Sequence, residues 1–175
     1  LDLINTALEN IENKESHDAK KLKIRSCILE RSLADVMKDT SSRYKDAVAL
    51  YESCIKKLTR LVSLNDESLA VARHNLGELY LRMKLPEKAT RYFQPALDAL
   101  TVSLGDHPQV ATILSSYASC YVQLKQFDKA LDLYQKSYKM KSDILGADHR
   151  SLYIVLKNIT SLYLKLKKKD YALSA

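Results

Sequence analysis

The side chains in this sequence that most often bind metals or act as nucleophiles are its four histidines and three cysteines. They are His17, His74, His107 and His149, together with Cys27, Cys54 and Cys120. The cysteines lie far apart and form no Cys-x-x-Cys pair, which argues against a disulfide framework and against a zinc site. We therefore predict three small apolar core residues in a reducing compartment, the cytoplasm. Because the sequence begins at Leu1 rather than Met, the lack of a targeting signal carries no weight.

Two of the histidines share a local phrase, Leu-Gly-Asp-His-Pro over 104–108 and Leu-Gly-Ala-Asp-His over 145–149. The phrases lie about forty residues apart, so we predict that His107 and His149 each cap a turn rather than bind one metal ion. The sequence contains no HExxH, no GxSxG and no glycine-rich phosphate loop. Its carboxylates are scattered along predicted helices. The sequence therefore predicts a protein that is not an enzyme, with no catalytic residues, no metal and no cofactor.

The shared phrase belongs to a longer period in the chain. Leu104-Gly105 recurs as Leu145-Gly146 after 41 residues. The same spacing of 41 or 42 relates two further sets, which are Tyr80, Tyr121 and Tyr163, and Ala89, Ala130 and Ala172. A fixed period in this range is typical of helical arrays, whose units bury their apolar faces by stacking on one another.

Each period has two segments with helical spacing. Apolar residues fall three or four apart in both segments, at Leu69, Ala72, Leu76, Leu79 and Tyr80, and at Ala89, Phe93, Ala96, Leu97 and Leu100. Pro86 suits the first turn of the second helix, and Gly105 and Gly146 suit left-handed residues at helix ends. The chain has only three Gly and three Pro, which points away from turn-rich β architecture. Each period is therefore predicted to form a helical hairpin.

The residues Gly77, Tyr80, Ala89, Phe93 and Ala96 resemble the signature of the tetratricopeptide repeat. The period of 41–42 is similar to the long variety of this repeat found in kinesin light chains. The resemblance implies an all-α fold, a right-handed superhelical stack of antiparallel helical hairpins. Small Gly77 and Ala89 would let two helices approach closely, with the aromatic rings filling the space beside them.

The repeat boundaries follow from the landmarks. We expect a single domain over 1–175, with a partial leading helix at 1–15, a degenerate repeat at 17–64, repeats at 67–105 and 108–146, and a truncated repeat at 149–175. Pro95 lies inside the predicted second helix of the repeat at 67–105. Because proline removes one helical hydrogen bond, we expect a kink near residues 91–95.

The resemblance also implies which residues bind a partner, because the first helix of each unit lines the concave groove. The candidates are Arg31, Ser32, Asp35, His74, Asn75, Glu78, Arg82, Ser115, Ser116, Ser119, Gln123, Lys157, Asn158, Ser161 and Lys165. The expected function is a non-catalytic scaffold or adaptor that holds a partner peptide in this groove. Only part of the paired asparagine pattern of kinesin light chains is present, so their cargo specificity is not expected here. The alternative is a structural subunit packed permanently within a large multiprotein complex.

The charge of the chain bears on the class of partner. The formal net charge is +7, and the groove candidates Arg31, Arg82, Lys157 and Lys165 favour an acidic or phosphorylated peptide. The basic stretches at 20–25 and 165–170 lack the interleaved exposed aromatics typical of nucleic-acid binding, so no nucleic acid is expected. No run of about 18 apolar residues occurs, which excludes membrane insertion by a spanning helix.

Overall fold

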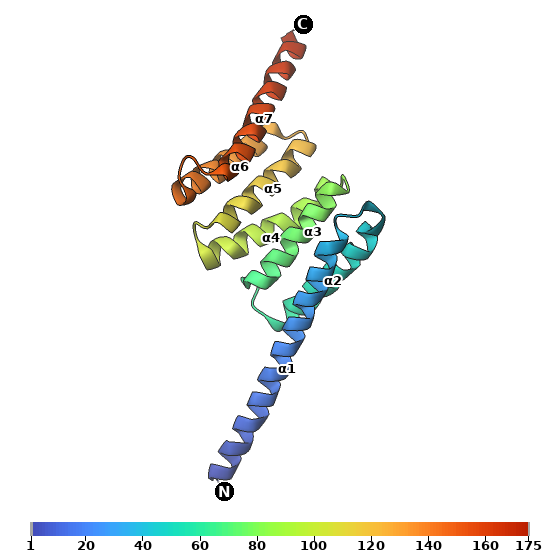
Figure 1. Ribbon diagram of the computed structural model, residues 1–175, viewed down its shortest axis with the longest axis vertical. Helices are drawn as coiled ribbons and strands as arrows, with labels where there is room; N and C mark the ends of the chain where they lie inside the picture. The colour runs from blue at the N-terminus through green and yellow to red at the C-terminus, as the bar shows by residue number, and fades with distance from the viewer. Residues whose placement is uncertain (1, 175) are drawn as a thin grey trace. The chain divides into compact units, whose positions relative to one another are not determined.

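The computed structural model of the protein describes residues 2–174, and it describes side chains for residues 16–167 (Figure 1). Within these residues the chain forms seven α-helices and one short 3-10 helix. They are α1 (Asp2–Met37), η1 (Ser41–Arg43), α2 (Tyr44–Leu61), α3 (Glu67–Arg82), α4 (Pro86–Leu104), α5 (Pro108–Gln123), α6 (Phe127–Leu145) and α7 (Arg150–Ser174). The chain divides into two compact units, residues 1–63 and residues 64–175, and each is described by itself. The predicted all-α fold of helical hairpins is confirmed.

In the second unit, helices α3 to α7 pack in chain order, each against the next. The hairpins α3–α4 and α5–α6 coincide with the repeats predicted at 67–105 and 108–146. Gly77 on α3 is buried against the ring of Phe93 on α4, and a Cβ atom added at Gly77 would lie only 2.9 Å from Phe93 Cε1. The predicted close approach of the two helices at Gly77 is therefore confirmed.

Aromatic rings continue the packing from one hairpin to the next. The His74 ring lies 5.7 Å from that of Phe93, which lies 6.0 Å from Tyr117 on α5, measured between ring centroids. Tyr117 in turn lies 4.9 Å from Tyr121. Tilted ring pairs at these separations are favourable beyond the apolar area they bury. These ring contacts join α3, α4 and α5 to one another.

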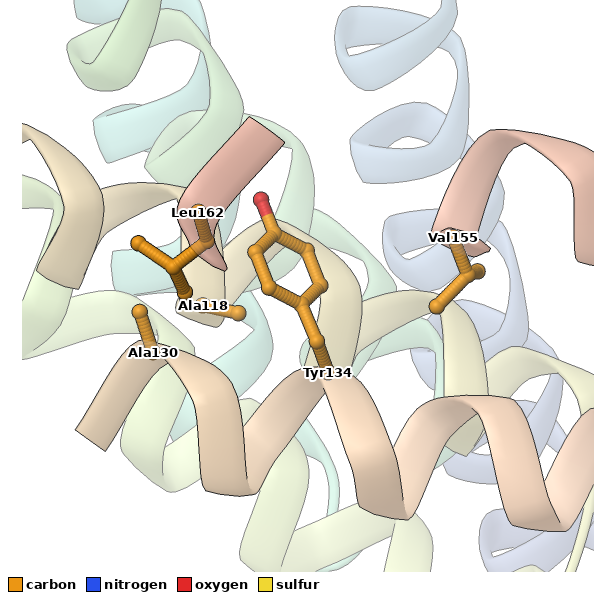
Figure 2. Close-up of a cluster of buried hydrophobic side chains, with 5 residues drawn as sticks. All are labelled: Ala118, Ala130, Tyr134, Val155 and Leu162. Atoms are coloured by element: carbon orange, nitrogen blue, oxygen red, sulfur yellow. The ribbon is translucent and has the colours of Figure 1, made fainter. Parts of the chain in front are cut away.

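The same arrangement of small and aromatic residues recurs where α7 joins the stack. A buried cluster is formed by Ala118 of α5, Ala130 and Tyr134 of α6, and Val155 and Leu162 of α7 (Figure 2). Figure 2 shows the Tyr134 ring standing among the smaller side chains. The alanines allow α5 and α6 to approach, while the valine and leucine of α7 cover the remaining apolar surface.

The turns between hairpins have the caps that the sequence predicts. The Nδ1 atom of His107 accepts a hydrogen bond from the backbone N–H of Gln109 at 3.2 Å, and His149 does the same for Ser151 at 3.2 Å. The two φ angles of Gly105 and Gly146 are +61° and +86°, values that glycine adopts without a steric cost. Both predictions, capping histidines and positive-φ glycines, are confirmed.

The turns within the hairpins hold a feature that the sequence did not reveal. Lys84 and Lys125, which are equivalent residues of successive repeats, have φ angles of +61° and +59°. The residue after each lysine donates its backbone N–H five residues back, from Leu85 to Tyr80 O and from Gln126 to Tyr121 O, both at 2.9 Å. This pattern is the Schellman motif, which usually has glycine at the left-handed position.

The first unit is the hairpin of α1 and α2, packed around Cys27, Ala34, Tyr51, Cys54 and Leu58. Helix α1 runs without a break from Asp2 to Met37, so no boundary separates the leading helix expected at 1–15 from the repeat expected at 17–64. The reason is that no glycine or proline occurs between residues 1 and 37 to stop a helix.

At the other end of the chain α7 also runs further than expected. It continues to Ser174, so residue 172 does not begin the second helix of a truncated repeat as its spacing from Ala130 suggested. Helix α4 is continuous across Pro95, and the kink expected near residues 91–95 stays a prediction.

Candidate functional site

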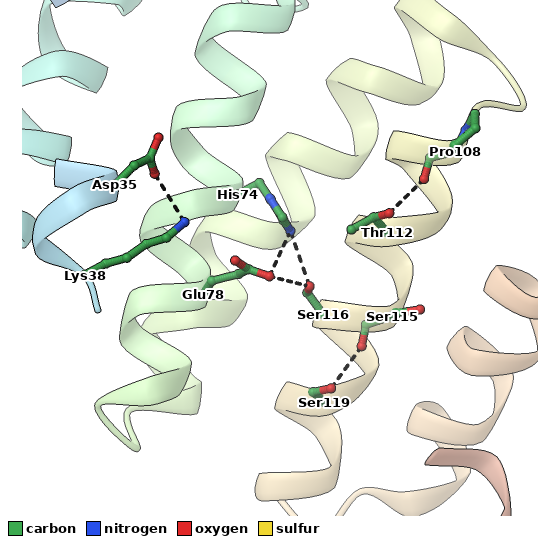
Figure 3. Close-up of polar contacts among 9 residues, drawn as sticks. All are labelled: Asp35, Lys38, His74, Glu78, Pro108, Thr112, Ser115, Ser116 and Ser119. Carbon is green, nitrogen blue, oxygen red and sulfur yellow. Dashed lines mark hydrogen bonds and ion pairs between the residues drawn. The ribbon is translucent and has the colours of Figure 1, made fainter. Parts of the chain in front are cut away.

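A cluster of polar side chains joins the first helices of two successive hairpins, α3 and α5. Ser116 Oγ donates a hydrogen bond to Glu78 Oε1 at 3.1 Å, and His74 Nε2 lies 3.3 Å from Ser116 Oγ. The His74 Nε2 and Glu78 Oε1 atoms are 3.6 Å apart, one helical turn from each other on α3. Figure 3 shows the three side chains converging between the two helices. Three of the predicted groove residues are thus brought together.

A fourth predicted residue extends this contact along the same pair of helices. Gln123, near the end of α5, donates from Nε2 to the backbone oxygen of Leu81 on α3 at 3.3 Å. We call the surface formed by His74, Glu78, Ser116 and Gln123 the α3–α5 face. Asn75 is half-buried and Arg82 is exposed on α3.

A cleft of about 260 Å³ opens beside the α3–α5 face, and His74 belongs to both. Its other walls are mostly apolar and come from three helices; they are Val71, Leu100, Pro108, Gln109, Thr112 and Ile113. The repeat pattern in the sequence does not point to these residues as binding residues. Spacing on α3 and α5 could have suggested Val71 and Ile113, but only the packed hairpin brings Leu100 of α4 beside them.

Two predicted groove residues point elsewhere. Ser115 Oγ lies 2.7 Å from Ser137 Oγ, and Ser119 Oγ lies 2.8 Å from the Tyr134 hydroxyl, so both reach toward α6. Ser137 itself is fully buried and donates to the backbone oxygen of Ala111 at 2.6 Å. Ser115 and Ser119 therefore act in the packing of their own hairpin, and the structure does not join them to the α3–α5 face.

Two of the predicted residues on α7 line a depression of their own. Lys157 and Ser161 line a shallow depression along that helix together with Tyr153, Leu156 and Leu164. Asn158 is half-buried and Lys165 is exposed on the same helix. This depression is mainly apolar, and Lys157 is the charged residue in its lining.

The remaining predicted residues belong to the first unit. Asp35 accepts from the Tyr51 hydroxyl and from Lys38 Nζ, the latter at 3.3 Å. Arg31 is half-buried, with its Nε atom buried and without a hydrogen-bond partner, and Ser32 donates to the backbone oxygen of Ile28. Asp35 thus joins α1 to α2, whereas the Ser32 hydrogen bond lies within α1.

The three cysteines are buried thiols with raised pKa values. Burial raises the pKa of the Cys54 and Cys120 thiols to about 12, and it also raises that of Cys27. The three cysteines are free and buried, as predicted, so they are protonated thiols at neutral pH. In the part of the chain that the structure describes, no group of three or more His, Cys, Asp or Glu side chains could hold a metal ion. None of the described helices is long and apolar enough to cross a membrane.

A family model of the tetratricopeptide repeat matches residues 67–143 and residues 109–175, which together are more than half of the chain. The chain belongs to the tetratricopeptide repeat family. Repeats of this family generally mediate interactions between proteins and are typically non-catalytic. The periodic landmarks and the helical hairpins are thus those of a tetratricopeptide array.

Two curated proteins resemble parts of these tetratricopeptide repeats. A clustered mitochondria protein homolog of Meyerozyma guilliermondii is 25% identical over 136 residues, covering 74% of this chain and 11% of that protein. The secreted RxLR effector protein RXLR-C07 of Plasmopara halstedii is 29% identical over 101 residues, covering 58% of this chain and 29% of that protein. The chain therefore spans less than a third of the length of either relative.

Solved structures agree on the fold of the tetratricopeptide array. Crystallised TPR-like repeats from Podosopora anserina, described as those of a kinesin light chain, superpose with a TM-score of 0.74 at 16% identity, covering 87% of this chain and 72% of theirs. The crystal structure of BtubC (BKLC) from P. vanneervenii gives a TM-score of 0.74 at 17% identity, covering 85% of this chain and 59% of that one. At these identities the likeness establishes the fold alone.

Proposed function

We propose that the chain is a non-catalytic scaffold that holds an extended peptide segment of a partner protein across the first helices of its second unit. The observation that carries this proposal is the α3–α5 face beside its apolar cleft. Polar groups that can donate and accept stand next to a recess that accepts an apolar side chain. Peptide-binding surfaces combine these two elements, polar groups for the backbone and a pocket for an anchor side chain.

The cleft suggests how the peptide is anchored. Its lining by Val71, Leu100, Pro108 and Ile113 favours an aliphatic or aromatic side chain, because that side chain would leave water without leaving a polar group unpaired. Gln109 and Thr112 stand at the same cleft and can meet peptide backbone groups. We therefore expect the partner segment to contain one large apolar residue.

The charge of the surface suggests the flanking residues of the peptide. Arg82 on α3 and Lys157 and Lys165 on α7 are exposed, and the whole chain has a net charge of +7. An acidic or phosphorylated segment next to the apolar anchor would complement these cations. Glu78 is the carboxylate at the α3–α5 face, and it already accepts a hydrogen bond from Ser116.

The proposal is tested by selecting peptides from a random displayed library and measuring their affinity by titration. We expect selected sequences to combine acidic residues with one large apolar residue. The Arg82→Glu and Lys157→Glu double variant should weaken the best peptide about tenfold or more. A double variant with the same charge change on second helices, Arg91→Glu with Lys139→Glu, should leave the affinity unchanged. Equal losses in both double variants would refute the assignment of the surface.

A second test addresses the cleft alone. Thr112 is exposed at its wall, and Thr112→Phe should fill the recess and weaken the peptide. Thr101→Phe places the same ring at an exposed position of α4 outside the cleft and is the matched control. Unchanged affinity in the Thr112 variant would show that the cleft does not hold an apolar side chain of the peptide.

The alternative function, a subunit packed within a large assembly, has one observation in its favour. Tyr153, Ile154, Tyr163 and Leu164 of α7 are large apolar side chains that are exposed. Clusters of exposed apolar residues often mark permanent contacts between proteins. Native mass spectrometry of material from its own cells separates the two functions, since a stoichiometric complex supports the subunit and a free chain supports the scaffold.

A further inference from the structure

Within the first unit, helix α1 has a row of exposed apolar side chains that α2 does not cover. Leu22, Leu29, Leu33 and Val36 are exposed by 63%, 70%, 53% and 74%. Ala19 and Ser26 are also exposed and complete a row with steps of three and four residues from Ala19 to Val36. Cys27 and Ala34, which face α2, are fully buried and lie on another side of the helix. We call the row Ala19, Leu22, Ser26, Leu29, Leu33 and Val36 the α1 seam.

The spacing of the α1 seam indicates what kind of structure covers it. Alternating steps of three and four residues give a period of 3.5, which keeps a row of side chains facing one partner helix along its length. In heptad notation Ala19, Ser26 and Leu33 are a positions, and Leu22, Leu29 and Val36 are d positions. The seam is about 27 Å long at 1.5 Å per residue, or five helical turns. A single helix lying alongside α1 would cover all of it.

The charges beside the seam indicate that the partner helix is α1 of a second copy. In a parallel pair, each g residue meets the e residue five positions later on the other helix. Asp18 then faces Lys23 of the second copy, and Arg25 faces Glu30 of the second copy, so both contacts are attractive. In an antiparallel pair with a layers opposite d layers, only Lys23 and Glu30 would make an attractive contact of this kind, because the residue opposite Asp18 would be Asp39, which lies beyond the end of α1 at Met37. The charge pattern therefore favours the parallel pair.

We propose that two copies of this chain dimerise by pairing their α1 helices as a parallel two-stranded coiled coil along the α1 seam. Glu30 already contacts Lys57 and Ser53 of α2 within its own chain. Asp18 and Lys23 are both exposed, so their contact is the sharper test of the register. Ser26 places one polar residue at an a position, a feature that selects register at a cost in affinity. The proposal concerns the first unit and does not depend on the peptide-binding face of the second.

The first experiment measures the assembly state of the whole chain by sedimentation velocity at increasing concentration. Because the seam has few heptads, we expect a dissociation constant on the order of 10⁻⁵ M. Leu29→Glu, which brings two like charges into the seam, should weaken the dimer about tenfold or more. Val102→Glu is the matched control, because Val102 on α4 is also 70% exposed. Circular dichroism of both variants checks that the helices are retained.

Each outcome of this experiment bears on the proposal. A chain that stays monomeric at several hundred micromolar overturns it, and the seam would then need a helix from another protein. A dimer that Leu29→Glu leaves intact, or that Val102→Glu weakens equally, also overturns it. A dimer lost only in the Leu29 variant supports it.

Two further variants test the parallel register. Ser26→Cys should form an interchain disulfide on mild oxidation, because a parallel pair places the same a position of both copies side by side. Lys21→Cys, on the side of α1 away from the seam, should not. Asp18→Lys and Lys23→Asp should each weaken the dimer, and the double swap should restore it. A dimer that does not crosslink at Ser26, or that the double swap fails to restore, would contradict the parallel pair.

Discussion

Gly77 shows how a single missing side chain sets the spacing of a hairpin. The Phe93 ring fills the space in which a Cβ atom would stand, and atoms of that ring would lie 2.9 to 3.1 Å from it. Real Cβ contacts are almost never so short, so either the ring or the helix would have to move. Phe93 also contacts His74 and Tyr117, which leaves its ring little freedom to turn.

Gly77→Ala should therefore destabilise the second unit even though alanine favours helix. Overpacking a tight core costs about 1–3 kcal/mol, whereas replacing glycine within a helix gains roughly 1 kcal/mol or less. We expect a net loss in the free energy of unfolding, measured by urea denaturation. Adding Phe93→Leu to the alanine variant should recover part of the loss if the clash is the cause. A gain in stability on Gly77→Ala alone would show that the ring adjusts freely.

Lys141 on α6 is a buried charged residue that lowers the stability of the fold. Its side chain is only 9% exposed, and burial lowers its pKa from the ordinary value of 10.5. The unfolded chain therefore binds more protons than the folded chain just below pH 10.5, and the contribution of Lys141 to stability rises with pH in that window. At neutral pH the lysine is charged in both states and the burial penalty is fully present.

Lys141→Met should stabilise the protein at neutral pH, because methionine keeps the length of the side chain and removes the buried charge. The gain should shrink as the pH rises toward the window in which the lysine loses its proton. Melting temperatures at several pH values measure this difference. Lys139→Met, at an exposed position of the same helix, is the control and should show no such gain. A loss of stability in the Lys141 variant would mean that its amine makes a favourable contact.

At the scale of elements, the turns within the hairpins contain backbone strain that a glycine would relieve. Lys84 and Lys125 adopt positive φ angles that cost a residue with a side chain about 1–2 kcal/mol. The Schellman hydrogen bonds and the packing of the two helices keep them there. Glycine at either place would keep the same hydrogen bonds without the steric cost.

Lys84→Gly and Lys125→Gly should each raise the free energy of unfolding by roughly 0.5–1 kcal/mol, after allowing for the greater freedom of glycine in the unfolded chain. Chemical denaturation measures the change. Lys88→Gly, in the first turns of α4, should instead destabilise, because glycine is a poor helix former. If Lys84→Gly and Lys125→Gly lower the stability as well, the lysine side chains contribute more than the strain costs.

At the scale of the molecule, the two compact units should respond separately to damage. Contacts in such arrays are local, so a lesion in one hairpin is expected to loosen that hairpin first. Leu58→Ala removes a side chain that is almost fully buried in the first unit and should cost about 2–5 kcal/mol there. Amide hydrogen exchange should show faster exchange in α1 and α2, with α5 and α6 little changed. Uniformly faster exchange across all helices would show that the chain unfolds as one cooperative block.

The sequence by itself determined the array, because its period is a physical requirement of stacking. Hairpins can pack against one another only if small residues recur at places such as Gly77 and Ala89 and rings at places such as Tyr80 and Phe93. The spacing of these residues therefore indicates the hairpins from the sequence alone. Glycine at 105 and 146 and histidine at 107 and 149 likewise have local roles at helix ends that depend on a few neighbouring residues. Such features can be read from one short stretch of chain.

Only the tertiary structure decided which polar side chains meet. His74, Glu78 and Ser116 converge because α3 and α5 lie side by side at one rotation, whereas Ser115 and Ser119, on the same helix as Ser116, turn toward α6. Ser116 lies about 100° around the helix from Ser115, and packing across the hairpin decides which of these two faces meets α3. The sequence did not reveal the positive φ angles of Lys84 and Lys125, which belong to the folded turns, or the exposure of the α1 seam, which depends on what packs against that helix.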